Sequence, residues 1–65
     1  MTNTEARITL GLREDDRITE SGLEAVKEHL EWEYARSNTV EKRQIRKEME
    51  AVDTLLYYGR VYGKW

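Results

Sequence analysis

The sequence predicts a mainly α protein: an antiparallel hairpin of two helices over residues 6–65, with an extended arm or short strand at its N-terminal side. Three observations indicate this fold. The chain has 65 residues and no proline, so one small domain with uninterrupted helices is expected. Two segments carry apolar residues at helical spacing. The polar turn between them is only a few residues long, and such a short connection makes neighbouring helices antiparallel.

The N-terminal part of the chain shows a different pattern. Residues 1–5 are polar, and we expect them to be disordered. In residues 7–13, Ile8, Leu10 and Leu12 alternate with other residues, which is the period of a half-buried strand. A single strand has no pairing partner within the chain. It would therefore pair with another subunit or a partner's sheet edge, or the segment would lie over the helices as an extended arm.

The first helix is predicted at about residues 20–35. Thr19 and Ser21 are alternative N-caps, and we favour a start near Glu20. Thr19 would place apolar residues at the two positions of a hydrophobic staple, whereas Ser21 would place Glu24 in a capping box. The main apolar stripe of this helix consists of Leu23, Val26, Leu30 and Tyr34.

The second helix is predicted at about residues 39–58. Asn38 followed by Glu41 forms a capping box at its start, and Gly59 is placed where a glycine ends a helix. Residues 59–65 then form a short aromatic tail, which either packs down or binds a partner. The apolar stripe of this helix consists of Ile45, Met49, Val52 and Leu56.

Each helix also carries a second, weaker apolar stripe, and a lone hairpin buries only one stripe per helix. We therefore predict a homodimer or higher oligomer, or a partner protein, that covers the second stripes, with Trp32 as the main anchor. The alternative is that the arm and the tail fold back over them. The predicted interface residues are Ala25, His29, Trp32, Leu55, Tyr58, Tyr62 and Trp65.

Charged residues form two groups of opposite sign. The first helix carries an acidic stripe, and the turn and the first half of the second helix carry a basic group. These groups are either partner sites for a basic protein and for phosphates, or solvated faces that partly neutralise each other. We favour solvated faces. The acidic group is Glu20, Glu24, Glu28 and Glu31, and the basic group is Arg36, Lys42, Arg43, Arg46 and Lys47.

The composition argues against several kinds of chemistry. The chain has no cysteine and one histidine, so we expect no disulfide and no metal site. It has no phosphate-binding glycine loop and no nucleophile–base pair, so we expect neither an enzyme nor a bound cofactor. No apolar run is long enough to cross a membrane, and the start lacks the features of a signal peptide. We expect a cytoplasmic protein, in the host cytoplasm if a phage encodes it.

The order of a strand at residues 7–13, a helix, a short turn at residues 36–39 and a second helix resembles the ribbon-helix-helix family of DNA-binding repressors. In that family two strands pair across a dimer and their outward residues enter the major groove. The resemblance implies that Arg7, Thr9 and Arg13 read DNA, and that amides at the start of the second helix bind phosphate. A transcriptional repressor is therefore the alternative function.

The residues themselves favour a small non-enzymatic binding protein, an inhibitor or adaptor of another macromolecule. The net charge of −2 does not by itself attract nucleic acid, so the expected partner is another protein. Short, charged chains without cofactors are often encoded by phages or mobile elements, and we extend that association to this chain. A third function, binding of a small anion such as a nucleotide between subunits, would use Arg43, Arg46 and Lys47.

Overall fold

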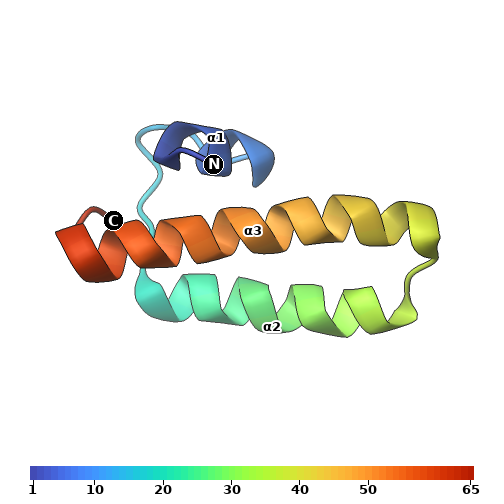
Figure 1. Ribbon diagram of the computed structural model, residues 1–65. Helices are drawn as coiled ribbons and strands as arrows, with labels where there is room; N and C mark the ends of the chain where they lie inside the picture. The colour runs from blue at the N-terminus through green and yellow to red at the C-terminus, as the bar shows by residue number, and fades with distance from the viewer.

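The structure is a computed structural model that describes residues 1–65, and it contains three helices and no strand. Helix α1 spans Asn3–Thr9, α2 spans Glu20–Arg36 and α3 spans Thr39–Tyr62. Both α1 and α2 pack on α3, from different sides (Figure 1). At 24 residues, α3 is about 36 Å long at 1.5 Å per residue. It therefore runs the full length of a molecule whose longest dimension is 35 Å.

The helical hairpin is confirmed. The Thr19 hydroxyl accepts a hydrogen bond from the N–H of Gly22 at 3.1 Å, so Thr19 is the N-cap of α2. The side-chain oxygen of Asn38 accepts from the N–H of Glu41 at 2.9 Å and caps α3. Only Ser37 and Asn38 separate the two helices. None of the helices combines the length and the apolar character needed to cross a membrane.

The predicted end of the second helix is wrong, because α3 continues one turn past Gly59. The glycine that ends α3 is Gly63, which has a φ of 67° and donates its N–H to the carbonyl of Gly59 at 2.9 Å. Glycine adopts this left-handed conformation without a steric penalty. Gly59 instead lies buried inside the helix, under the ring of Trp65.

The predicted N-terminal strand is also wrong, since residues 3–9 form α1. The Thr2 hydroxyl accepts from the N–H of Glu5 and donates to its carboxylate, both at 3.1 Å, so Thr2 is the N-cap of α1. Helix α1 thus takes in residues 3–5, which were expected to be disordered. Gly11 then turns the chain away from α1 with a φ of 72°. Ile8, expected on the buried face of a strand, is 71% exposed.

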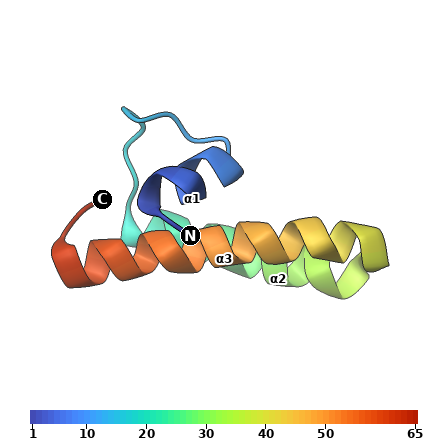
Figure 2. The same ribbon diagram turned by 45° about the horizontal axis from the view of Figure 1, so that its top comes forward.

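The core lies where α1 and α2 meet α3. Helix α1 covers the second apolar stripe of α3, so Ala51 is 0% and Leu55 only 2% exposed. The predicted role of Leu55 at an interface is therefore corrected, because this residue belongs to the core. Figure 2 shows α1 lying over the C-terminal half of α3. The buried residues are Ala6, Leu23, Leu30, Ile45, Ala51, Val52, Leu55 and Leu56.

Candidate functional site

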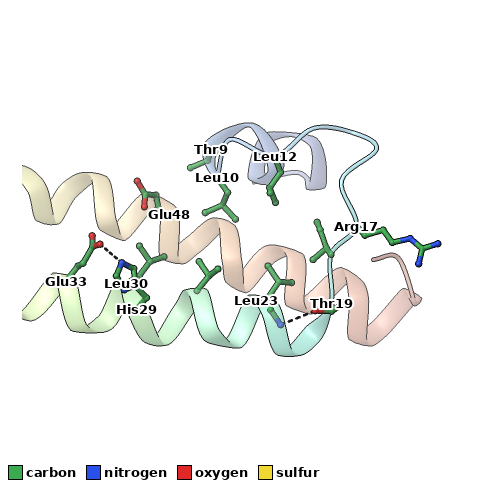
Figure 3. Close-up of a pocket in the computed structure, with 13 residues that line it drawn as sticks. Thr9, Leu10, Leu12, Arg17, Thr19, Leu23, His29, Leu30, Glu33 and Glu48 are labelled. Carbon is green, nitrogen blue, oxygen red and sulfur yellow. Dashed lines mark hydrogen bonds and ion pairs between the residues drawn. The ribbon is translucent and has the colours of Figure 1, made fainter.

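One of the two hollows of the molecule is a groove between the segment that follows α1 and the neighbouring face of α2 (Figure 3). It has a volume of ≈ 470 Å³. In Figure 3, Leu10 and Leu12 point from the N-terminal segment toward the long helices, opposite Leu23 and Leu30 on α2. The apolar lining of the groove is Leu10, Leu12, Ile18, Leu23, Val26 and Leu30.

The start of α2 explains the apolar lining at one end of the groove. With Thr19 as N-cap, Ile18 and Leu23 occupy the two positions of a hydrophobic staple, and both line the groove. Ile18 is half-buried against the core. One turn further along α2, Val26 is 40% exposed in the wall of the groove. The groove thus presents apolar surface that the chain's own residues do not fully cover.

The two ends of the groove differ in charge. Glu33 and Glu48 lie at one end. There a carboxylate oxygen of Glu33 lies 2.5 Å from the Nε2 atom of His29, and Glu48 accepts a hydrogen bond from Gln44 at 3.3 Å. Arg17 lies at the opposite end, with its side chain directed outward (Figure 3). The groove therefore has an acidic end and a basic end.

Arg7 fixes the loop that forms one wall of the groove. Its guanidinium donates to the carbonyl oxygens of Arg13 at 2.9 Å and Asp16 at 3.3 Å, and to the main-chain oxygen of Trp65 at 2.8 Å. The N–H of Arg13 donates to the carboxylate of Asp16 at 2.8 Å, which closes the loop on itself. One side chain therefore holds α1, the loop and the end of the chain together.

The aromatic tail partly packs down. Trp65 is 37% exposed, and its six-membered ring lies against Gly59, where an added methyl group would overlap it. Tyr57, Tyr58 and Tyr62 form a cluster on the last turns of α3, with ring centroids 5.7–6.1 Å apart. The adjacent Tyr62 hydroxyl raises the pKa of Tyr57.

A second surface lies on the side of α2 that faces away from α3. Trp32 is 56% exposed there and stacks on His29, with ring centroids 6.3 Å apart and an angle of 15° between the planes. The Arg36 guanidinium lies 4.0 Å from the centroid of the Trp32 ring, a cation–π contact. Ala25 and Glu28 complete a shallow hollow beside Trp32. Of the predicted interface residues, Ala25, His29 and Trp32 are thus brought together.

Part of the predicted charge is neutralised between helices. Arg60 on α3 pairs with Glu20 and, at 2.9 Å, with Glu24, and these carboxylates raise its pKa. Lys27 pairs with Asp53 at 2.8 Å, and this hydrogen-bonded carboxylate raises the pKa of Lys27. Two of the four glutamates in the acidic stripe therefore have partners within the chain.

The residues predicted to bind anions are not gathered in a hollow. Arg46 donates to the Tyr34 hydroxyl at 2.9 and 3.2 Å, between α3 and α2, and the Lys42 ammonium lies 5.1 Å from the centroid of the same ring. Arg43 and Lys47 are exposed and, like Arg46, line neither hollow of the molecule.

The residues expected to read DNA have other contacts. The Thr9 hydroxyl donates to the carbonyl of Glu5 at 2.8 Å. The Arg7 guanidinium holds the loop as described above, and Arg13 takes part there through its main-chain groups. The paired strand that would present them to the major groove is not formed. The structure therefore does not support the DNA-reading role that the ribbon-helix-helix resemblance implied.

Comparison with protein-family models, with curated proteins and with solved structures finds no match for this chain. No three side chains of the types that ligate metals come together. The groove and the Trp32 surface are therefore the features from which a function is inferred. The sequence pattern missed the groove, because Leu10 and Leu12 were assigned to a strand. The overlooked signal is Thr2 followed by Glu5 three residues later, the spacing that marks a helix start.

Proposed function

We propose that this protein is a non-enzymatic binding protein, an inhibitor or adaptor, that takes up an amphipathic helix of another protein in its groove. The observation that carries the proposal is the partly open, apolar groove of ≈ 470 Å³ in a chain of 65 residues. Apolar grooves between helices are the usual sites for an amphipathic helix, whose anchors recur at i, i+3, i+4 and i+7.

The dimensions support a helical occupant. The wall provided by α2 runs from Thr19 to Glu33, which is about 21 Å at 1.5 Å per residue. A bound helix of about four turns would match that length. Its apolar residues would contact Leu12 and Val26 and remove their surface from water, at roughly 25 cal/mol per Å².

The charge at the two ends predicts the direction of the bound helix. The N-terminus of a helix carries a partial positive charge and its C-terminus a partial negative charge. The favourable orientation places the N-terminal end near Glu33 and Glu48 and the C-terminal end near Arg17. Basic residues in the first turns of the partner would strengthen this arrangement.

The test is a selection of helical peptides from a displayed library against the wild-type protein, followed by affinity measurement by calorimetry. The variant Val26→Asp puts a charge into the groove wall. Val40→Asp is the matched control, because Val40 is 77% exposed and lies outside the groove. Selected peptides should bind Val26→Asp at least about tenfold more weakly, a loss of about 1.4 kcal/mol, and Val40→Asp unchanged. Equal binding to both variants, or no enrichment of amphipathic peptides, would contradict the proposal.

A further inference from the structure

The outer face of α2 carries a charge pattern that is complementary to itself. Glu28 and Arg36 each stand four residues from Trp32, on its N-terminal and C-terminal sides. Each is therefore about 6 Å from Trp32 along the helix axis. All three side chains are exposed, and Figure 1 shows this helix with neither α1 nor α3 on its far side.

We propose that two copies of this chain pair through antiparallel α2 helices, with a twofold axis passing near Trp32. In a twofold interface the same patch is used by both copies, so each contact occurs twice. An axis at Trp32 brings Glu28 of each copy level with Arg36 of the other. The two indoles meet at the centre, and two ion pairs flank them.

Within one copy, Arg36 and Trp32 already lie in positions that suit the proposed contact between two α2 helices. Arg36 already lies over its own Trp32 ring at 4.0 Å, so its guanidinium can keep this cation–π contact while its edge donates to a carboxylate opposite. Ala25 and His29 border the hollow beside Trp32, which has a volume of ≈ 460 Å³. This hollow leaves room for the indole of the second copy.

The proposed interface is small. A stable protein–protein interface typically buries about 800 Å² per partner, more than the outer face of one helix of 17 residues offers. We therefore expect a dimer that dissociates in the micromolar range. Its core lies on the outer face of α2, whereas the partner helix of the proposed function lies in the groove. The two sites share only His29, so variants at Glu28 and Arg36 test the dimer separately from the groove.

Charge-reversal variants test the pairing, and sedimentation equilibrium measures the dissociation constant of the dimer. Protein concentrations between 5 and 500 μM, a range of roughly a hundredfold, cover dissociation in the micromolar range. Glu28→Arg and Arg36→Glu should each weaken the dimer at least about tenfold, since like charges then face each other. An equimolar mixture of the two variants should form a heterodimer of wild-type affinity, because both ion pairs are restored. Glu50→Arg, the same charge change on α3, is the matched control and should leave the affinity unchanged.

Three results would overturn the proposal. The wild-type protein could remain monomeric at all concentrations, the single charge reversals could leave the dimer intact, or the mixture could fail to associate. Far-UV circular dichroism checks that each variant is helical. If a charge reversal unfolds the chain, Ala25→Arg replaces it, because this residue is exposed and lies one helical turn from Glu28 on the same face. It should also separate the copies.

Discussion

Replacing Gly59 with alanine brings two opposing effects together in one residue. Alanine is favoured over glycine inside a helix by up to about 1 kcal/mol, and Gly59 lies three residues before the end of α3. The added methyl group would, however, overlap the ring of Trp65. The indole of Trp65 must then leave its site on α3. This movement would also pull the main-chain oxygen of Trp65 away from the Arg7 guanidinium.

The cost of moving Trp65 follows from its burial. About two thirds of its surface is covered, which corresponds to about 160 Å² and roughly 4 kcal/mol of transfer free energy at 25 cal/mol per Å². Ordering the two or three tail residues opposes this by about 1–2 kcal/mol each. The two terms nearly cancel, so the packed tail contributes no more than about 2 kcal/mol, comparable with the gain from alanine.

A double-mutant cycle separates the two effects. Gly59→Ala should be close to neutral in the wild-type protein and should stabilise the Trp65→Ala variant by up to about 1 kcal/mol. The assay is urea denaturation followed by circular dichroism. An equal effect of Gly59→Ala in both backgrounds would refute the packing of Trp65 on α3.

Three further predictions concern the loop, the core and the surface. Arg7→Lys should speed hydrogen exchange in residues 10–19 but not in the centre of α3, because an ammonium lacks the planar fork with which Arg7 reaches three main-chain oxygens. Unchanged exchange in residues 10–19 would contradict this role of Arg7. Leu55→Ala should lower the free energy of unfolding by about 2–5 kcal/mol, measured by thermal denaturation. This is a large part of the roughly 3–10 kcal/mol expected for a domain of this size. A change as small as that for an exposed residue would place Leu55 outside the core. Asp53→Asn should lower the pKa of Lys27 toward its ordinary value of 10.5, measured by NMR titration. Because the folded-state pKa is raised, the pair stabilises the protein fully below pH 10.5 and loses this effect as the pH rises through the raised value. The variant should therefore lack this alkaline loss.

The two long helices could be predicted because each has a strong periodic stripe and a clear N-cap. Thr19 and Asn38 lie at the predicted helix starts, and the turn is too short for any other arrangement. The predicted end of the second helix is wrong because a glycine near the end of a helix can have either of two structural roles. Gly59 provides space for a neighbouring ring, whereas Gly63 provides the left-handed conformation. The sequence pattern does not distinguish these uses.

The groove could not be predicted because it depends on α1. This helix has seven residues and buries one of them, Ala6, so it shows almost no helical stripe. The alternation of Ile8, Leu10 and Leu12 therefore hides the helix-start signal of Thr2 and Glu5. In the structure this alternation arises across a turn: Ile8 lies on the outside of α1, and Leu10 and Leu12 line the groove. The exposure of Trp32, in contrast, followed from its position in the helical period.

The most direct measurement for the groove is NMR chemical-shift mapping of the protein with a selected amphipathic peptide. Binding in the groove predicts the largest changes at the methyl groups of Leu10, Leu12, Val26 and Leu30. Changes centred on Arg43 and Lys47, on the outer face of α3, would contradict it and would point to recognition of negative charge instead.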